Sequence, residues 1–349
     1  MRPHEKMKRR KQMKIRNKLV GSMLTVTMGV SLTVCGTGLP VMAEEKTETA
    51  EKTETAEKTE GFPFTLKTKD DAEVTFTHVP EKVLAVNANA GDQLMAMGLG
   101  DKIIGRAYTN SKINPKWNDE YEKIADLGDG ALSLETILDQ EPDFVYGRSS
   151  AFSEKNNTTH DTLSQYGIMS LSSIEGYTLG ADVDVVYEDF YNLGRIFDME
   201  EKAEQIVNDM KTQIETVEKA VEGADTVKVF VYDMAQEGGA YTCGDNFTAK
   251  LMEHAGGENI FKDMEETWAN VSWEEVVERA PEVIVVNNYG DISLEQKMKE
   301  LKENPALADV PAIKEDRIIS VNLCEVFASS MTGDTIEKFA EAFHPECFE

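Results

Sequence analysis

The sequence DMEEKAEQIVNDMKTQIETVEKAVEG, Asp198 to Gly223, organises the rest of the chain. Its apolar residues recur at intervals of three and four, the spacing of an amphipathic helix. Neither Gly nor Pro interrupts the run, and Gly223 is a natural residue to end a helix. We therefore predict a single long helix, whose apolar stripe consists of Ala203, Ile206, Val207, Met210, Ile214, Val217, Ala220 and Val221.

The segments on either side of this helix repeat one another. SLETILDQEPDFVY, from Ser133, and SWEEVVERAPEVIV, from Ser272, share Ser, the third-position Glu, Pro, an acid and an apolar strand without gaps. LMAMGLGDKII, from Leu94, and LMEHAGGENIF, from Leu251, share the initial Leu-Met, a Gly in register and the closing apolar pair. The two matches occur in the same order along the chain. The repeat predicts two duplicated lobes with the helix as a stiff strut between them. An ordinary surface helix in one continuous domain is the alternative.

Each lobe alternates strands with helices, which predicts an α/β fold with a parallel sheet in each. The first lobe is expected over 62–197, beginning with a hairpin at Phe62–Phe76, and the second over 224–349. Gly238–Tyr241 is expected to be a flexible loop after the strand Val227–Tyr232. Ligands of parallel sheets lie beyond the carboxyl ends of the strands, so a ligand is expected between the two lobes.

Candidate ligand residues follow the predicted strands or lie in nearby loops. Arg148 alone among the five arginines after Ala43 lies at a strand's carboxyl end in a Gly/Ser loop. It could grip an anionic catecholate or carboxylate, and a surface salt bridge is the alternative. Aromatic side chains and one amide would complete the cleft, although each aromatic could equally belong to the local core. The proposed set is Tyr108, Phe152, Tyr241, Trp268, Asn288 and Tyr289, with Glu325 and Phe327 as weaker candidates.

The chain begins with an export signal. A basic segment, MRPHEKMKRRKQMKIRNK, precedes the apolar run Leu19–Val34. This run suits the core of a signal peptide better than a membrane span because it has 16 residues. Small residues in Val41-Met42-Ala43 offer a signal-peptidase site, which would make residues 1–43 the signal peptide.

A lipid anchor is the alternative exit. Leu32–Cys35, LTVC, resembles a bacterial lipobox, which would shorten the signal to residues 1–34 and lipidate Cys35. Val34 departs from the pattern, where Gly or Ala is usual, so both exits stay open. In either case the body is exported from the cytoplasm. Residues 44–61 contain Glu, Lys, Thr and Ala with no large apolar residue before Gly61, and are expected to be a disordered, solvated tether.

The charge distribution argues against two classes of partner. The formal net charge is −28, and residues 1–18 contribute +8 through nine Lys or Arg and one Glu, so the rest carries a net charge near −36. Such an acidic body is repelled by nucleic acid and by anionic lipid headgroups. We expect the protein to meet a membrane only through a lipid anchor.

Six stretches that sample Val79 to Ile319 together resemble the substrate-binding proteins of ABC importers for ferric siderophores, haem and cobalamin. The resemblance implies two Rossmann-like lobes joined by one long helix, and the capture of a ligand for an ABC importer permease dimer. Within this group, the sequence of these stretches is most similar to that of the iron-complex binders. The stretches are VPEKVLAVNANAGDQLMAMGLGDKIIGRA, LSLETILDQEPDFVYG, NLGRIFDMEEKAEQIV, AGGENIFKD, VSWEEVVERAPEVIVVNNYG and NPALADVPAIKEDRII.

The resemblance also implies a ligand and a docking device. The expected ligand is an Fe(III)-siderophore or similar iron chelate, with haem or a corrinoid such as cobalamin as alternatives. We expect no permanently bound cofactor and a monomeric protein. In the family, one acid near the start of an equivalent helix of each lobe docks to permease arginines, and the matching residues are Glu135 and Glu274. Their alternative role is to favour a helix N-terminus.

Other functional classes find less support. No dinucleotide fingerprint follows a strand, and neither a P-loop nor a G-x-S-x-G elbow occurs, so an enzyme is not expected. An exported adhesion or scaffold protein is the remaining alternative. A protein metal site is not expected, because the histidines form no ligand pair, although His160 could be an axial ligand for haem. Cys243, Cys324 and Cys347 form no C-x-x-C motif.

Overall fold

The computed structural model describes residues 61–236 and 238–348. The predicted signal peptide, Cys35 and the tether up to residue 60 lie outside the described residues. No helix within the described part of the chain combines the length and the apolarity that a membrane crossing requires.

The first lobe is built on a four-stranded parallel sheet in the order β4-β3-β5-β6. The predicted hairpin is confirmed by the antiparallel pair β1 and β2, which pairs Phe64 with Phe76. The strands of this lobe are β1 (Phe64–Lys67), β2 (Glu73–Phe76), β3 (Val83–Val86), β4 (Ile103–Ala107), β5 (Phe144–Gly147) and β6 (Met169–Ser172). Its helices are α2 (Ala88–Ala96), α3 (Asn118–Tyr121), α4 (Leu134–Asp139), α5 (His160–Gln165) and α6 (Val183–Phe197).

The second lobe has a four-stranded parallel sheet in the order β10-β7-β12-β13. Its strands are β7 (Val227–Tyr232), β10 (Gly257–Asn259), β12 (Val283–Asn288) and β13 (Ile318–Asn322). A separate antiparallel sheet contains β8 (Met234–Gln236), β9 (Gly239–Cys243) and β11 (Trp268–Ser272). Its helices are α8 (Phe247–His254), α9 (Trp273–Arg279), α10 (Leu294–Lys302), α11 (Pro311–Lys314) and α12 (Thr332–Phe343).

The two parallel sheets confirm the duplicated α/β architecture. In chain order, each has its second strand at one edge, then the first, third and fourth strands. The repeated serines also occupy equivalent places: Ser133 caps α4 and Ser272 caps α9, each accepting a hydrogen bond from a backbone N–H in the first turn. Sequence periodicity and capping residues therefore located this repeat correctly.

The long predicted helix exists as α7, Glu200–Ala220, two residues shorter than expected at its start and three at its end. Asp198 adopts left-handed backbone angles (φ 56°), which ends α6 and separates it from α7. Val221 is the C-cap residue, and Gly223 takes its left-handed angle (φ 84°) two residues later, so Gly223 does not cap the helix. The buried face of α7 carries Ala203, Val207, Met210, Ile214 and Val217.

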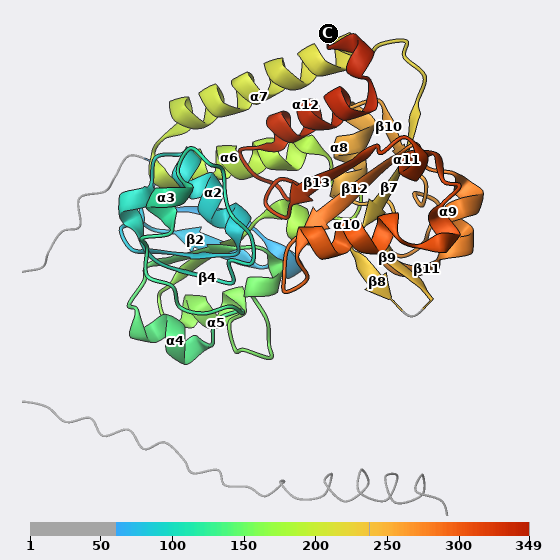
Figure 1. Cartoon of the computed structure of the whole chain (residues 1–349). Helices are drawn as coiled ribbons and strands as arrows, with labels where there is room; N and C mark the ends of the chain where they lie inside the picture. The colour runs from blue at the N-terminus through green and yellow to red at the C-terminus, as the bar shows by residue number, and fades with distance from the viewer. Residues whose placement is uncertain (1–60, 237, 349) are drawn as a thin grey trace, which may run out of the picture. The chain divides into compact units, whose positions relative to one another are not determined.

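Helices α6, α7 and α12 join the lobes into one packed body. In Figure 1, α7 runs from the first lobe to the second and α12 lies alongside the part of it near the second lobe; both α6 and α12 contact α7. A single apolar core includes buried residues of both parallel sheets and of these helices. Since close-packed cores resist deformation, this packing favours limited lobe movement.

Two segments cross reciprocally between the lobes. After β13, Ala328 O accepts hydrogen bonds from Asn89 Nδ2 (3.2 Å) and Gln93 Nε2 (3.1 Å) of the first lobe. The Ser330 N–H donates to buried Asp92 (2.7 Å). After β6, the chain reaches α6, whose N-cap Asp182 contacts His254 of the second lobe. Each lobe thus contributes a segment that is fixed by its partner lobe.

Candidate ligand-binding site

A cavity of about 560 Å³ opens between the two lobes, at the carboxyl ends of their parallel strands. Asn87 follows β3, Tyr108 follows β4 and Arg148 follows β5. In the second lobe, Asp233 follows β7 and Tyr289 follows β12. The predicted position of a ligand beyond the strand ends therefore coincides with a real hollow.

Two residues that line this cavity have unusual backbone angles. Asn87 has φ 83° and Tyr108 has φ 54°, both in the left-handed region. Asn tolerates this region, but for a bulky residue such as Tyr it is uncommon. Local strain of this kind persists where the surroundings hold the residue, and it concentrates at functional sites.

Tyr241 and Trp268 form an aromatic wall on one side of the cavity. Their rings stack with centroids 5.6 Å apart and an interplanar angle of 22°. They lie on the neighbouring antiparallel strands β9 and β11, in which Tyr241 is paired with Asn270. Both side chains are half-buried, so part of each ring remains available to a ligand. Stacked rings offer a large, rigid apolar surface at low entropic cost.

The position of this wall corrects the prediction of a flexible loop at Gly238–Tyr241. Gly239 to Tyr241 belong to strand β9. A Cβ atom on Gly239 would overlap the carbonyl oxygen of Val271 on β11, so the two strands approach closely only because this residue is Gly. Adjacent glycines are typical of a flexible loop, but here Gly239 permits a strand pairing.

Arg148 lines the cavity but already has a partner. Its Nε and Nη2 donate to the two carboxylate oxygens of Glu175 at 3.0 and 2.8 Å. Its guanidinium also lies over the ring of Phe327, 3.9 Å from the ring centroid. The backbone N–H of Arg148 donates to Asn87 Oδ1. The bidentate pair neutralises the cation, so an anionic ligand would have to compete with Glu175.

Replacement of Arg148 by Ala is expected to destabilise the fold by about 2–4 kcal/mol, because the Glu175 side chain is only 9% exposed and would lose its counter-charge. Urea unfolding of the purified protein measures this cost. The double variant Arg148→Met with Glu175→Met should recover part of the loss, since it leaves no unpaired charge. A loss below about 0.5 kcal/mol in Arg148→Ala would show that the pair is loose and the guanidinium free for an anion.

The cavity wall carries more negative than positive charge. Among the cavity-lining residues, all within the described part of the chain, Arg148 is the only Lys or Arg, whereas Glu175, Asp233 and Asp245 are carboxylates. Asp233 accepts hydrogen bonds from Asn287 Nδ2 (2.9 Å) and from the Tyr289 hydroxyl (2.7 Å). Each of these carboxylates lies near a cation, because Glu175 pairs with Arg148, Asp245 pairs with Lys250 and Lys297 lies behind Asp233. The wall therefore offers an anionic ligand no unpaired cation.

A buried lysine supports this wall from behind. Lys297 of α10 is 1% exposed and donates to the carbonyl oxygens of Asp233 (2.7 Å) and Asn287 (2.6 Å). Burial lowers the pKa of the Lys297 ammonium. The ammonium also lies 4.7 Å from the centroid of the Tyr289 ring. Lys297 thus fixes the strand ends that present Asp233 and Tyr289.

The structure brings five of the seven proposed ligand residues together: Tyr108, Arg148, Tyr241, Trp268 and Tyr289. Phe152 does not line this cavity, because it is 3% exposed and packs in the first-lobe core with its ring 4.2 Å from that of His160. Asn288 also lies outside it and donates to Asn322 (3.2 Å). Of the weaker candidates, Phe327 lines the cavity, whereas Glu325 binds Lys338 instead.

His160 has a local structural role. Its two ring nitrogens lie 2.7 Å from the Ser170 hydroxyl and 3.0 Å from the Ser172 hydroxyl. Burial lowers the pKa of His160 to about 4, so the ring is neutral at physiological pH. It does not line the interlobe cavity, which leaves it badly placed to ligate a haem held there.

Sequence reasoning missed one whole wall of the cavity. Residues 175 to 181 all line it, from within a short 3₁₀ helix (Ile174–Tyr177) to just before the start of α6. Leu179, in this segment, is 87% exposed. The segment has no helical or strand periodicity, so only its glycines and its apolar Leu in EGYTLGA could have singled it out.

The two predicted docking acids are both exposed. Glu135 and Glu274 each occupy the second helical position, in α4 and α9 respectively, after the caps Ser133 and Ser272. Neither carboxylate forms an ion pair with another of the described residues. The structure thus leaves both charges available to a partner.

The described residues offer no built-in metal centre. Residues 61–236 and 238–348 contain no group of three or more His, Cys, Asp or Glu placed to hold a metal ion. Cys243 and Cys324 are buried and Cys347 is half-exposed, and all three are free thiols. Burial raises the pKa of the Cys243 thiol to about 12, which makes it unreactive.

The sequence matches a family model and several characterised or named relatives. Residues 83–322 match the family described as periplasmic binding protein. The chain is 24% identical over 293 residues to the uncharacterized ABC transporter substrate-binding lipoprotein YvrC of Bacillus subtilis, covering 82% of this chain and 88% of the relative. It is 23% identical to a vitamin B12-binding protein of Vibrio parahaemolyticus, covering 72% and 85%.

Solved structures of binding proteins superpose on this chain over most of their length. A periplasmic binding protein from Veillonella parvula superposes with a TM-score of 0.73 at 26% identity, covering 81% of this chain and 97% of that one. A structure named for the ABC-type Fe3+-hydroxamate transport system of Saccharomonospora viridis gives a TM-score of 0.68 at 26% identity, covering 81% and 99%. A haem-binding protein from Roseiflexus, 19% identical, shares the fold, with a TM-score of 0.64 and coverage of 76% and 99%.

Proposed function

Because the chain belongs to the periplasmic binding protein family, whose members serve transport and not catalysis, we propose that it captures an iron chelate without net negative charge for an ABC importer. The observation that carries this proposal is the cavity between the lobes, with its Tyr241–Trp268 wall and its neutralised arginine. Ligand sites of this kind combine aromatic surface with a few polar groups.

The charge of the wall selects among ferric chelates. A ferric tricatecholate is a trianion, whereas a ferric trihydroxamate is neutral. Glu175, Asp233 and Asp245 line the cavity, and Arg148 is engaged by one of them. Asp245 is paired with Lys250, and Lys297 lies behind Asp233, so no cation of the wall is left unpaired for a trianion. A trianion would lose hydration without gaining a counter-charge. The proposed cargo is therefore a ferric hydroxamate, and the related hydroxamate-system structure supports the same choice.

A corrinoid is the second candidate. Two relatives are named vitamin B12-binding proteins, and the match with this chain covers 85% of the length of each. Cobalamin carries no net negative charge and has a large apolar face, so the same aromatic wall would suit it. The cavity of about 560 Å³ is open, which allows a larger ligand to protrude.

We expect the protein to bind a ferric trihydroxamate at least tenfold more tightly than a ferric tricatecholate of similar size, because the wall offers the trianion no unpaired cation and the body as a whole is acidic. Quenching of tryptophan fluorescence, with Trp268 in the wall, measures both affinities. The difference should shrink when salt is raised from about 0.01 to 1 M. Equal or tighter binding of the tricatecholate would contradict the proposed ligand class, and binding of cobalamin alone would favour the second candidate.

Export and delivery complete the proposed function. The uncharacterized relative is named a lipoprotein, which favours the lipobox at Cys35 over cleavage after Ala43. We propose that the protein is held on the outer face of the cytoplasmic membrane by that lipid, and presents its cargo to the permease dimer through Glu135 and Glu274. Labelling of producing cells with a radioactive fatty acid tests the anchor, and Cys35→Ser should abolish the label. Label retained in Cys35→Ser would exclude this cysteine as the attachment site.

A further inference from the structure

The cavity wall that the sequence did not reveal, residues 175–182, is called the strap here. Residues Glu175 to Ala181 line the cavity, and Asp182 is the N-cap of α6. Leu179 lies between Gly176 and Gly180 and exposes 87% of its surface, although it is strongly apolar. An isolated exposed Leu needs no explanation by itself. Here, however, it lies on a cavity rim, in a segment that is fixed at both ends.

The first end of the strap is fixed within its own lobe. Glu175 receives the bidentate bond of Arg148, and the Ser149 hydroxyl donates to the carbonyl oxygen of Gly176. A Cβ atom on Gly176 would lie 3.0 Å from the backbone nitrogen of Ser149, so this close contact favours Gly. Just before the strap, the Ile174 N–H donates to buried Asp189 (3.0 Å).

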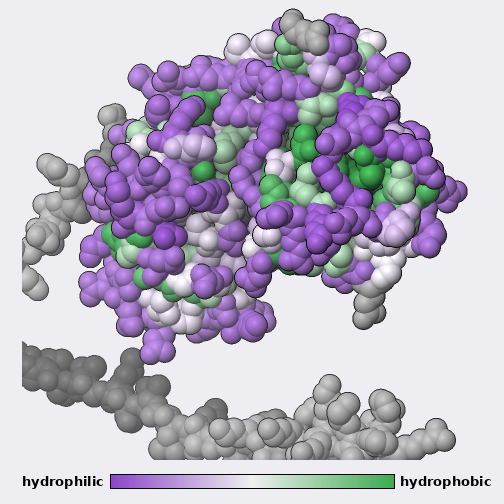
Figure 2. All heavy atoms as spheres, in the orientation of Figure 1, coloured by the Kyte–Doolittle hydropathy of each residue, from purple (hydrophilic) through white to green (hydrophobic). Residues whose placement is uncertain are grey.

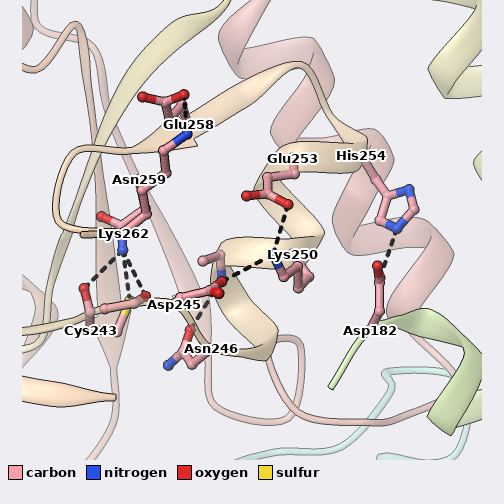
Figure 3. A network of polar contacts seen from close by, with 12 residues as sticks. Asp182, Cys243, Asp245, Asn246, Lys250, Glu253, His254, Glu258, Asn259 and Lys262 are labelled. Atoms are coloured by element: carbon pink, nitrogen blue, oxygen red, sulfur yellow. Dashed lines mark hydrogen bonds and ion pairs between the residues drawn. The ribbon is translucent and has the colours of Figure 1, made fainter. Parts of the chain in front are cut away.

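The second end is fixed by the other lobe. His254, the last residue of α8, lies with Nε2 at 2.8 Å from Asp182 Oδ1 and with Nδ1 at 2.6 Å from Glu218 Oε1 of α7. Figure 3 shows the Asp182 carboxylate pointing at the His254 ring. One imidazole thus bridges the strap to α7 and α8.

The geometry of this bridge depends on protonation. A neutral imidazole has one N–H, so it can donate to Asp182 or to Glu218 but not to both. An imidazolium donates from both ring nitrogens. Two carboxylates at hydrogen-bonding distance therefore favour the charged ring, and the hydrogen bond with Asp182 is the largest cause that raises the pKa of His254 above its usual value.

The other charges around His254 act in the same direction. Glu222, which follows the C-cap of α7, and Glu253 of α8 line the same hollow as the bridge. A nearby cation, Lys250 of α8, is paired with Glu253 and with Asp245, both at 3.1 Å. Figure 3 shows these pairs beside α8, which follows Asp245 and its N-cap Asn246 at the cavity and ends at His254. Helix α8 therefore connects the bridge directly to the cavity wall.

We propose that residues 175–182 form a strap that lays Leu179 over the cargo, and that protonated His254 clamps the strap to the second lobe. Cargo is then held more tightly at mildly acidic pH and released more readily as pH rises. This proposal rests on the function proposed above, since it assigns the strap to that same cavity. The sign follows from the bridge: the His254 contribution is complete below the unfolded pKa of about 6.5 and is lost as pH rises through the higher folded pKa.

The first test measures the dissociation constant of a ferric trihydroxamate between about pH 5.5 and 8.5. The wild-type constant should rise by roughly fivefold or more across this range. His254→Gln, which is uncharged at every pH, should give a flat profile. Asp182→Asn should also flatten it, while the helix cap is kept because Asn caps as well as Asp. Parallel slopes in the wild type and in His254→Gln would overturn the clamp.

Leu179→Ser tests the cover itself. It should weaken binding of the ferric trihydroxamate roughly fivefold or more, with the pH slope retained. Tyr166→Ser is the matched control, because Tyr166 is exposed on the first lobe and does not line the cavity. Equal affinities of Leu179→Ser and the wild type would overturn the role of Leu179.

A second measurement needs no ligand. Hydrogen–deuterium exchange of the peptide covering residues 174–182 should be several-fold faster in His254→Gln than in the wild type at pH 6, with unchanged exchange in β3 and β7. Equal exchange in the strap would overturn the clamp even if every chelate fails to bind. Failure of all chelates together with faster strap exchange would instead contradict only the proposed ligand class.

Discussion

Trp268→Ala is expected to weaken binding of the cargo by roughly 30- to 1000-fold, which corresponds to about 2–4 kcal/mol. Trp268 presents half of the stacked wall, and its indole rests on Tyr241 at a centroid separation of 5.6 Å. Removing the indole takes away its own contact with the ligand and the ring that holds Tyr241 in place. Large, partly desolvated aromatic rings carry much of the affinity at binding sites.

Calorimetry is the suitable measurement, because the variant also removes the fluorescent reporter. Trp268→Phe should lose less affinity, since a ring remains stacked on Tyr241. Tyr166→Ala is the control for exposed aromatic residues outside the cavity. If Trp268→Ala bound as tightly as the wild type, the cargo would not use this wall, and the assignment of the cavity would be wrong.

Charge reversal at both docking acids, Glu135→Lys with Glu274→Lys, is expected to reduce uptake of the cargo at least tenfold while its dissociation constant stays within about twofold. Both carboxylates are exposed and lie at equivalent positions of α4 and α9, outside the cavity. Contact pairs between close opposite charges across protein interfaces couple by about 1.5–7 kcal/mol. Reversal replaces two such attractions with repulsion, so docking should fail although cargo is still captured.

Uptake of a radioactive iron chelate by cells that produce each variant measures this effect. Glu201→Lys with Glu204→Lys is a matched control, because it changes the net charge equally at exposed sites of α7. Each single reversal should give an intermediate loss. Unchanged uptake in the double variant would contradict the docking role, and equal losses in the control would attribute the effect to net charge alone.

The duplicated fold could be predicted because local signals repeat in this chain. Ser133 and Ser272 cap equivalent helices, and apolar runs followed by polar residues mark the ends of the parallel strands. Strand ends converge on one edge of a sheet, so Tyr108, Arg148 and Tyr289 could be placed on a common rim from their positions alone. The geometry of parallel sheets, and not the chemistry of single residues, carried that prediction.

Contacts between distant residues limited the rest of the site. The partner of Arg148 is Glu175, 27 residues further along, and no local pattern marks such a pair. Phe152 has the composition of a ligand residue, but the turn after β5 directs it into the core beside His160. The sheet of β8, β9 and β11 depends on a close approach of Gly239 to Val271, which a single sequence does not show.

The rigidity of the body bears on how the strap works. Both lobes share one core through α6, α7 and α12, and the segments at Ala328 and at Asp182 are each fixed by the opposite lobe. Such a body favours small lobe movements. Because the lobes move little, a local movement of the strap would cover the cargo in the cavity.

We infer that the cargo occupies the cavity between the lobes, against the Tyr241–Trp268 wall. A crystal structure of the protein grown with a ferric trihydroxamate tests this position most directly. We expect the chelate in contact with both rings, with Leu179 over it and with the Arg148–Glu175 pair intact. A chelate bound at any other place, or held by Arg148 after its separation from Glu175, would contradict this position.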